Sequence, residues 1–273
     1  MSDFLESMRA SSLQRVRHAV ASTPLHKVVS AALGIPKPPS MQPGIAGFDV
    51  IAEVKRKSPA YGALSSESAD ALVKRAQAYA QAGAIAVSVL TEPQRFGGEL
   101  AHLTGIAHAL RPLGVPVMRK DFIVDVYQVW EAAAAGAGGV LLIIRMVDDA
   151  MLMEMIEAAA QAKMFVLLEA FDEKDLLRAR PFVGVRKRIL LGLNARDLST
   201  LEVDSQRLIA LANKFPPNCL RVAESGISTA AEAKAVAKAG YALALVGTAL
   251  MRAREPQALV ADMLAAGREA TQR

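Results

Sequence analysis

The chain has 273 residues, of which 52% are hydrophobic and 22% are charged. This composition excludes a disordered or collagen-like chain and predicts a folded globular protein. The net charge of +5 comes from interspersed positive and negative residues, and only 5% of residues are aromatic, so we expect no nucleic-acid partner. The longest strongly apolar run, from Val140 to Ile144, is far shorter than a membrane span, so we expect no membrane contact.

The N-terminal segment and the cysteine content indicate a compartment. Asp3, Glu6 and Arg9 interrupt the first apolar residues, which excludes the continuous apolar stretch of a secretory signal. The one cysteine, Cys219, cannot form an internal disulfide and fits a reducing environment. We therefore expect a cytoplasmic protein without a cysteine-rich zinc site.

Short apolar runs alternate with amphipathic helical patterns along most of the chain, which is typical of β/α units on a parallel sheet. The predicted strands are Val50–Lys55, Ala84–Leu90, Val117–Lys120, Val140–Ile144, Phe165–Glu169, Ile189–Leu193, Arg221–Ala223 and Leu243–Val246. Eight such units predict an α/β fold, a (β/α)8 TIM barrel over residues 50–273. No G-x-G-x-x-G motif follows the first strand, which disfavours a doubly wound open sheet.

Helices are predicted between the strands and before the first one. One pattern over residues 72–80 ends before Gly83, and another over residues 129–134 ends before Gly136, where a helix C-terminus favours glycine. Residues 1–49 lie outside the repeat, and their spaced apolar residues predict one or two helices. Prolines then make an irregular link into the first strand. We expect this N-terminal helical extension to act as a lid or plug at one end of the barrel.

The first strand carries charge inside an apolar pattern. Its two-residue period places Ile51, Glu53 and Lys55 on one face and Ala52 and Val54 on the other. The second face is apolar and suits packing against helices, so Glu53 and Lys55 are expected to point into the barrel. For this pair alone, a structural ion pair is an equally good interpretation.

Other predicted strands also end in polar groups, namely Lys120, Glu169, Asn194 and Glu224. Barrel active sites lie at the carboxyl ends of the strands. Burying several ionisable groups is costly unless they pair or act on a ligand, so their convergence favours an active site. The last two strands are followed by Ser225–Gly226 and Gly247–Thr248, which predict a phosphate cradle of backbone N–H groups. Alternatively, these glycines belong to ordinary tight turns without a ligand.

Other reactive residues are poorly placed for chemistry. The histidines, His18, His26, His102 and His108, lie away from the predicted strand ends, and we interpret them as surface or packing residues. Cys219 precedes the seventh strand, at the end of the barrel opposite the expected site, so it is not predicted to be a nucleophile. No spacing of ligating residues indicates a metal site.

Seven segments of the sequence carry a family resemblance. They are IAEVKRKSPAYG at 51–62, SVLTEPQRFGG at 88–98, RKDFIVDVYQVWEA at 119–132, LLEAFDEKDL at 167–176, LGLNARDLSTLEVD at 191–204, VAESGIS at 222–228 and LVGTALMR at 245–252. In this order they closely resemble the indole-3-glycerol phosphate synthase family. The resemblance implies a (β/α)8 barrel with an N-terminal helical extension. It also implies a carboxy-lyase of tryptophan biosynthesis that converts 1-(2-carboxyphenylamino)-1-deoxyribulose 5-phosphate to indole-3-glycerol phosphate, with loss of carbon dioxide and water.

The resemblance also implies roles for individual residues. Lys120 is implied to be the general acid that protonates the substrate carbonyl, Glu169 to act in the dehydration, and Lys55 with Glu53 to assist proton transfer and hold the substrate carboxylate region. The other implied residues orient the substrate (Asn194, Arg196 and Glu224), bind its phosphate (Ser58, Ser225, Gly226, Gly247 and Thr248) or surround its aromatic ring (Ser88, Phe96, Phe122 and Leu141). We expect the nearby Lys55 cation and partial desolvation to lower the pKa of Lys120 and so improve proton donation.

The implied enzyme uses no cofactor and no metal, takes a small phosphosugar as its substrate, and is expected to be a monomer. The sequence departs from the usual residues of the family at Ala60, Ala170, Phe171 and Ala195. None of these departures removes a charged catalytic group.

Two alternatives stay open from the sequence. Another phosphosugar barrel enzyme, such as phosphoribosylanthranilate isomerase, would favour a cysteine and an aspartate at strand ends, and Cys219 is misplaced for that role. A non-catalytic paralogue that binds a phosphosugar is disfavoured because Glu53, Lys55, Lys120 and Glu169 occur together.

Overall fold

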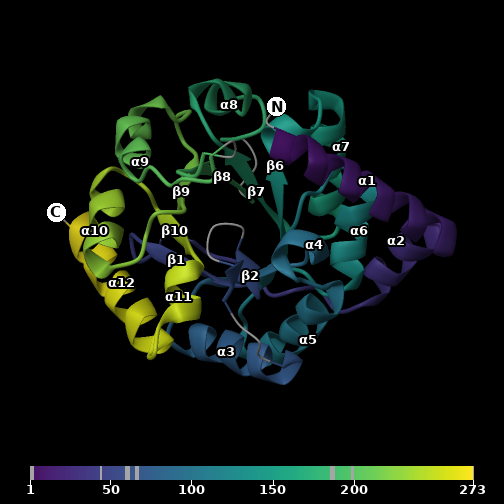
Figure 1. Cartoon of the computed structure of the whole chain (residues 1–273), viewed down its shortest axis with the longest axis horizontal. Coiled ribbons are helices and arrows are strands. Elements are labelled where there is room, and N and C mark those ends of the chain that lie inside the picture. The colour runs from purple at the N-terminus through teal and green to yellow at the C-terminus, as the bar shows by residue number, and fades with distance from the viewer. Residues whose placement is uncertain are drawn as a thin grey trace.

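A computed structural model describes residues 3–43, 45–58, 62–64, 68–184, 188–197 and 200–272. Within these ranges eight parallel strands close into a barrel, in the order β1-β10-β9-β8-β7-β6-β5-β4 (Figure 1). The barrel strands are β1 (Asp49–Val54), β4 (Ala86–Leu90), β5 (Val117–Lys120), β6 (Gly139–Ile143), β7 (Phe165–Ala170), β8 (Ile189–Asn194), β9 (Leu220–Glu224) and β10 (Leu243–Val246). The predicted (β/α)8 barrel is therefore confirmed.

Helices surround the barrel strands. They are α3 (Ala69–Gln81), α4 (Pro93–Phe96), α5 (Leu100–Leu110), α6 (Val126–Ala134), α7 (Asp149–Gln161), α8 (Glu173–Arg178), α9 (Gln206–Ala210), α10 (Ala230–Lys238), α11 (Thr248–Arg252) and α12 (Pro256–Thr271), with short 3-10 turns η1 (Arg111–Leu113), η2 (Ile144–Met146) and η3 (Ala212–Lys214). Gly83 and Gly136 follow the ends of α3 and α6 with left-handed φ values of 97° and 89°, as predicted for helix C-termini. In the part of the chain described here, no helix is both long and apolar enough to cross a membrane.

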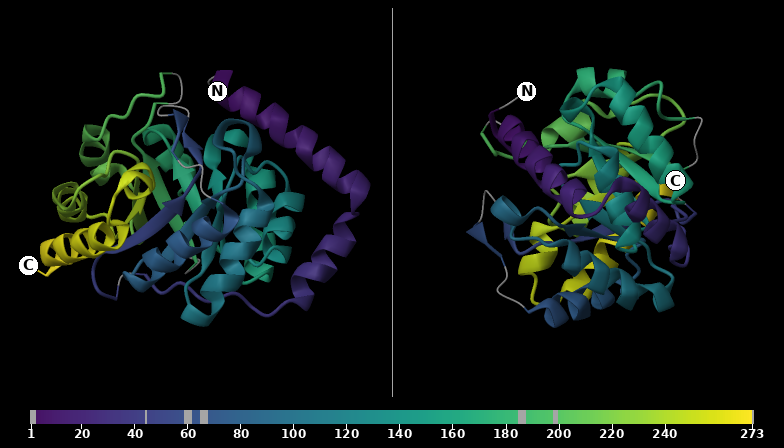
Figure 2. Two further views of the ribbon diagram at one scale, coloured as in Figure 1. Left: turned by 60° about the horizontal axis from the view of Figure 1, so that its bottom comes forward. Right: turned by 90° about the vertical axis from the view of Figure 1, so that its right-hand side faces the viewer.

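The two N-terminal helices, α1 (Asp3–Ser22) and α2 (Leu25–Gly34), lie outside the ring of barrel helices, where both contact α6 (Figure 2). Tyr127 on α6 donates its hydroxyl to the carbonyls of Ala19 and Thr23, at 3.1 and 3.0 Å. The buried Ser12 hydroxyl donates to the carbonyl of Phe122, in the loop after β5. The helices predicted before the first strand are therefore present, and α1 is tied to the loop that follows Lys120.

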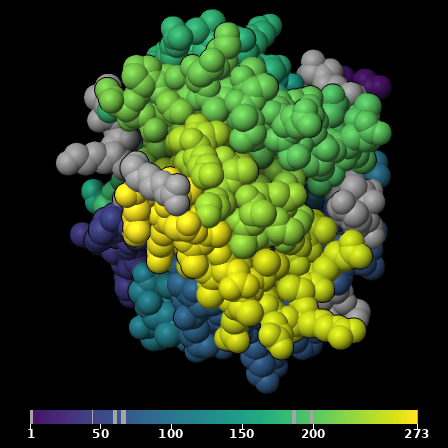
Figure 3. All heavy atoms as spheres, turned by 90° about the vertical axis from the view of Figure 1, so that its left-hand side faces the viewer, coloured from purple at the N-terminus to yellow at the C-terminus, as the bar shows by residue number. Residues whose placement is uncertain are grey.

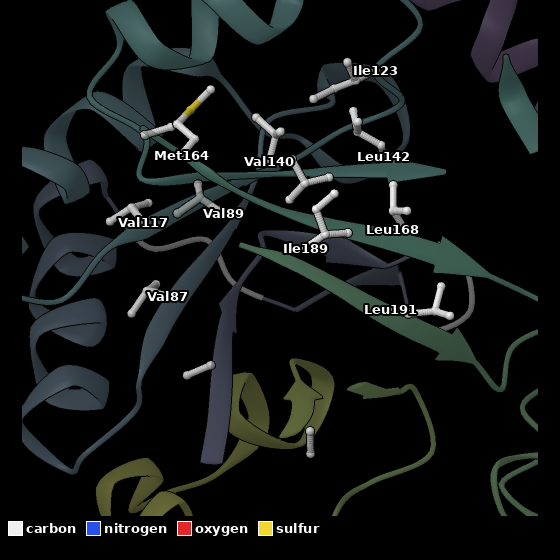
Figure 4. Packing of buried hydrophobic residues seen from close by; sticks show 14 of the residues in the cluster. Val87, Val89, Val117, Ile123, Val140, Leu142, Met164, Leu168, Ile189 and Leu191 are labelled. Carbon is white, nitrogen blue, oxygen red and sulfur yellow. The ribbon is translucent and has the colours of Figure 1, made fainter. Parts of the chain in front are cut away.

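Strand side chains alternate between two apolar layers, as the two-residue period predicts. Val50, Ala52 and Val54 belong to the outer layer beneath the helices, whereas Ile51 belongs to a separate cluster inside the barrel. Figure 4 shows members of the outer layer from neighbouring strands, among them Val87, Val89, Val117, Val140, Leu142, Leu168, Ile189 and Leu191. The predicted inward orientation of Glu53 follows from this alternation.

The first and last parts of the barrel are joined by α12, which packs against α10 and β1. Arg268 donates to the carbonyl of Phe48 at 3.1 Å and to the carboxylate of Asp49 at 3.2 Å. The Phe48 ring occupies the space where Gly267 would otherwise carry a side chain, so the helix can approach closely. Figure 3 shows this side of the molecule, where the C-terminal half of the chain, coloured green to yellow, makes most of the surface.

Some predicted boundaries are wrong. β1 ends at Val54 rather than at Lys55, and β4 begins at Ala86 rather than at Ala84, because the Ala84 N–H donates to the carbonyl of Tyr79 at the end of α3, at 3.1 Å. A short hairpin of β2 (Lys57–Ser58) and β3 (Gly62–Ala63) was not predicted. Strands of two residues are too short to show an alternating pattern.

Candidate active site

One cavity opens where the barrel strands end. It is lined by all the predicted site residues except Ser88, namely Glu53, Lys55, Ser58, Phe96, Lys120, Phe122, Leu141, Glu169, Asn194, Arg196, Glu224, Ser225, Gly226, Gly247 and Thr248. Their positions along the chain span most of the barrel, so strand closure brings them together. The predicted convergence of strand-end charges at one barrel mouth is confirmed.

Ser88 does not line the cavity. It is fully buried on β4, opposite Glu53 in the strand register, and its hydroxyl has no hydrogen-bond partner among the described residues. Leu90, two residues nearer the strand end, lines the cavity instead. The predicted contact of Ser88 with the aromatic ring of the substrate therefore gains no support from the cavity lining.

Lys120, the last residue of β5, is held by two carboxylates. Its Nζ atom lies 3.1 Å from Oε1 of Glu169 on β7 and 3.3 Å from Oε2 of Glu224 on β9. Asn194, at the end of β8, donates its amide to the same Oε1 atom of Glu169 at 2.8 Å. Four different strands thus place one ammonium, two carboxylates and an amide within direct hydrogen-bond contact.

Glu53 on β1 and Lys55, directly after that strand, extend this charged group. Lys55 Nζ lies 2.6 Å from Glu53 Oε1, so the two form the ion pair that the sequence left as an alternative. Both also line the cavity, so the pair belongs to the site. Gly247, after β10, lies directly over this pair, and a Cβ atom there would overlap the Glu53 carboxylate. The absence of a side chain at this position gives the pair its space.

Gly192 is a supporting residue that the sequence analysis missed. It lies in β8 opposite Glu169, and a Cβ atom at Gly192 would overlap Oε1 of Glu224. Without a side chain, β8 leaves room for the two carboxylates to lie side by side. The available signal was a glycine within a predicted strand, which often marks a close approach.

The pKa of Lys120 differs from the value expected from the sequence. Burial alone would lower the pKa of Lys120, but Glu169, Glu224 and Glu53 together raise it above its ordinary value. The predicted net lowering by Lys55 and desolvation is therefore wrong, because the three carboxylates outweigh the effect of burial. Burial and the neighbouring Glu169 raise the pKa of Glu224 well above its ordinary value. The site thus holds a charged lysine beside a carboxyl group that retains its proton more readily than usual.

The loops after β9 and β10 form another part of the cavity. Ser225 and Gly226 have left-handed φ values of 66° and 75°, and Gly247 immediately precedes α11. Backbone N–H groups in turns that contain a left-handed residue can form a concave site for an anion. Their place on the last two strands is the usual phosphate position of a (β/α)8 barrel. The phosphate cradle stays a prediction with this geometry in its favour.

Comparisons with known proteins place the chain in a family. A family model described as indole-3-glycerol phosphate synthase matches residues 6–263. The indole-3-glycerol phosphate synthase of Mycobacterium leprae (strain Br4923) is 41% identical over 256 residues, which cover 94% of this chain and 87% of that protein. The chain belongs to the indole-3-glycerol phosphate synthase family. The synthase of Micrococcus luteus is 43% identical over 245 residues, covering 89% of this chain and 85% of that one.

A solved structure supports the fold alone. The 3-hexulose-6-phosphate synthase from Salmonella typhimurium has a TM-score of 0.61 at 14% identity, and the match covers 82% of this chain and 100% of that chain. At this identity the likeness carries no information about the substrate.

Aromatic residues form a wall that the family resemblance identified only in part. Phe122 lies 6.1 Å from Phe96 and 5.8 Å from Phe4, measured between ring centroids. Phe4 comes from α1 and lines the cavity, as does Phe171 after β7. No pattern in the sequence indicates Phe4, because its approach to the cavity depends on how α1 packs against the barrel.

The other residues at which the sequence departs from the family, Ala60, Ala170 and Ala195, do not contribute to the described lining of the cavity. Ala170 and Ala195 are buried in the outer apolar layer, away from the cavity. Ala60 lies outside the described residues.

Arg196 lines the cavity, where its Nη1 donates to the carbonyl of Leu201 at 2.7 Å and its backbone N–H donates to the Asn194 side chain at 2.9 Å.

The histidines and Cys219 are not among the described residues that line the cavity. No group of three or more His, Cys, Asp or Glu side chains among the described residues could hold a metal ion. Cys219 directly precedes β9, at the opposite end of that strand from Glu224, and burial raises the pKa of its thiol, which disfavours a nucleophilic role.

Proposed function

We propose that the chain is a carboxy-lyase that closes the indole ring of 1-(2-carboxyphenylamino)-1-deoxyribulose 5-phosphate, giving indole-3-glycerol phosphate, carbon dioxide and water. The observation that carries the proposal is the position of Lys120 between Glu169 and Glu224, at 3.1 and 3.3 Å, in a cavity that also has an aromatic wall. The family to which the chain belongs supports the same reaction.

The first step is formation of a carbon–carbon bond. The ring carbon that bears the carboxylate attacks the ketone carbon of the sugar, and Lys120 donates a proton to the ketone oxygen as negative charge develops there. The carboxylates beside Lys120 raise the pKa of this amine, so it is protonated at neutral pH and transfers its proton only as negative charge develops on the ketone oxygen. Phe96, Phe122 and Leu141 hold the aromatic ring near the ketone, which lowers the entropic cost of the attack.

Decarboxylation and dehydration follow. Loss of carbon dioxide returns the bonding electrons to the ring and restores its aromaticity. The new hydroxyl group leaves as water after accepting a proton, and loss of a proton completes the indole double bond. We assign the dehydration to Glu169, which Asn194 holds at 2.8 Å, and we assign Glu53 and Lys55 to assistance in proton transfer beside the substrate carboxylate.

Substrate orientation is assigned to the rest of the cavity. Asn194, Arg196 and Glu224 orient the sugar chain between the aromatic wall and the loops after β9 and β10. The phosphate is assigned to Ser58, Ser225, Gly226, Gly247 and Thr248, all of which line the cavity. The two ends of the substrate are thus bound by chemically different walls, one apolar and one rich in N–H donors.

We also propose how the chain is organised and where it acts. Residues 1–49 form a helical extension that contributes Phe4 to the cavity, and residues 50–273 form the catalytic barrel. The enzyme is proposed to act in the cytoplasm as a monomer, on a small phosphosugar and without nucleic acid or membrane partners.

The test is direct. The purified protein is mixed with 1-(2-carboxyphenylamino)-1-deoxyribulose 5-phosphate, and indole fluorescence is followed with time. The proposal expects a signal that grows with protein concentration. A protein that binds the substrate without producing the signal would be a phosphosugar-binding paralogue, and production of the substrate from phosphoribosylanthranilate would indicate the isomerase.

A further inference from the structure

Phe171 occupies one of the positions at which the sequence departs from the usual residues of the family. It follows β7 two residues after Glu169, on the same inward face of the strand. Only 4% of its surface is exposed, yet it lines the cavity. It therefore meets any molecule that fills the cavity next to Glu169.

A network of charged groups fixes the Phe171 ring from behind. The guanidinium carbon of Arg145 lies 4.9 Å from the ring centroid, which is a cation–π contact. Arg145 donates its Nε to Asp175 at 2.9 Å and its Nη2 to Asp172 at 2.7 Å. The backbone N–H of Phe171 donates to the same Asp175 carboxylate, at 2.9 Å. Both the ring and its backbone are thus held by one ion network.

Phe171 separates this network from the cavity. Arg145, Asp172 and Asp175 do not appear in the described lining of the cavity, whereas Phe171 does. The guanidinium of Arg145 therefore occupies one face of the Phe171 ring. The ring presents an apolar surface to the cavity and covers the charged network behind it. Such a surface favours an aromatic group and disfavours a polar one.

The neighbours of Phe171 show which end of the substrate it would contact. It belongs to the same inner apolar cluster as Leu141 and Ile143 of the adjacent strand β6 and as Phe122 after β5. The loop with positive φ values at Ser225 and Gly226 lies after β9, on the other side of β8. Phe171 is therefore placed with the aromatic wall rather than with the predicted phosphate cradle.

We propose that Phe171, fixed by Arg145, is a specificity-determining residue that closes the pocket around the carboxyphenyl ring of the substrate and limits the size of ring substituents. This proposal rests on the proposed function for the identity of the substrate. Phe171 acts by direct contact with the ring, and Arg145 acts as a positioning residue by holding Phe171 in place.

The first measurement compares the Phe171→Ala variant with the unmodified protein. The KM for the carboxyphenylamino deoxyribulose phosphate is expected to rise about tenfold, with kcat reduced less than about threefold, because ring binding and not proton transfer is lost. Inhibition by inorganic phosphate is expected to stay within about twofold. Substrates with an added methyl group on the ring should gain in kcat/KM relative to the unsubstituted substrate.

Three further variants separate the effect of ring contact from an effect on folding. Phe182→Ala removes a similarly buried phenylalanine that does not appear in the described cavity lining, so it should lower the melting temperature without changing KM or ring selectivity. Arg145→Met removes the guanidinium behind the ring and should change KM and selectivity in the same direction as Phe171→Ala, by a smaller factor. An Arg145→Lys variant, which keeps a cation behind the ring, should recover part of that loss.

The outcomes distinguish this inference from the proposed function. Turnover by the unmodified protein, together with an unchanged KM and unchanged ring selectivity in Phe171→Ala, would overturn the inference alone. Absence of turnover by the unmodified protein would overturn the proposed function. In that case the binding of fluorescent 2-aminobenzoate decides the inference: weaker binding by Phe171→Ala than by Phe182→Ala supports it, and equal binding rejects it.

Discussion

The Nζ atom of Lys120 lies 3.1 Å from Oε1 of Glu169, although 49 residues separate them in sequence. Glu224, a further 55 residues along the chain, completes the contact from the other side. Both carboxylates are almost fully buried, so the charge of the lysine is balanced where water contributes little. This arrangement explains how an ammonium group can persist inside the barrel mouth and remain protonated for catalysis.

Replacing this ammonium tests its assigned role. Lys120→Met is expected to abolish turnover, a loss of roughly 10²–10⁴-fold for a general acid, while substrate affinity falls only moderately. The measurements are steady-state kinetics and equilibrium binding of the substrate. Lys214→Met, which changes a partly exposed lysine paired with Glu173, is the control and should leave both quantities unchanged. Substantial turnover in Lys120→Met would reject Lys120 as the acid.

Glu224 should make stability depend on pH. Because burial and Glu169 raise its pKa in the folded protein, the folded state binds more protons than the unfolded state above the ordinary pKa of about 4.5. The free energy of unfolding should therefore fall as pH rises through the folded-state pKa of Glu224. Chemical denaturation at a series of pH values should show that the free energy of unfolding falls less steeply with pH in Glu224→Gln than in the unmodified protein. Parallel curves for the variant and the unmodified protein would contradict the shifted pKa.

Asp121 should have the opposite effect on stability in acid. It accepts hydrogen bonds from Arg15 at 2.8 Å and from Arg119 at 3.2 Å. Burial would raise its pKa, but Arg119 and Arg15 lower it to about 2. The stabilisation is present above the ordinary pKa of 3.8 and is lost as pH falls toward about 2.

The Asp121→Asn variant measures this contribution. Removing one member of a buried ion pair leaves the arginines uncompensated, so the expected loss at neutral pH is about 3–5 kcal/mol of unfolding free energy. Asp149→Asn, in an exposed pair with Arg178, should cost less than about 1 kcal/mol. Equal losses of unfolding free energy in the two variants would show that the buried network stabilises the fold no more than an exposed ion pair does.

Inorganic phosphate should compete with the substrate for the loops after β9 and β10. At tens of millimolar it should raise the apparent KM without lowering kcat, relative to chloride at the same ionic strength. Gly226→Ala should weaken this inhibition, because its φ of 75° is strained for alanine and the new Cβ would press on Val203 and Ser205. Gly114→Ala has a similar φ of 69° with open space around it, so it controls for backbone strain. An apparent KM unaffected by phosphate would place the phosphate site elsewhere.

The repeating units and the orientation of their side chains can be predicted from the sequence. The eight apolar runs correspond to the eight barrel strands, and Glu53 and Lys55 point inward as their alternation with Ala52 and Val54 requires. These properties are local, because a strand turns successive side chains to opposite faces whatever the rest of the chain does. Segments of characteristic sequence also indicate the family.

The contacts between these side chains, and their effects on pKa values, depend on how the whole chain packs. Phe4 reaches the cavity because α1 packs on α6 and on the loop after β5, a contact between segments over 100 residues apart. The pKa of Lys120 rises rather than falls because barrel closure brings three carboxylates around it. Ser88 stays below the cavity because Leu90 lies nearer the strand end. Such distances depend on how eight strands stagger as they close, and no local pattern of residues specifies that geometry.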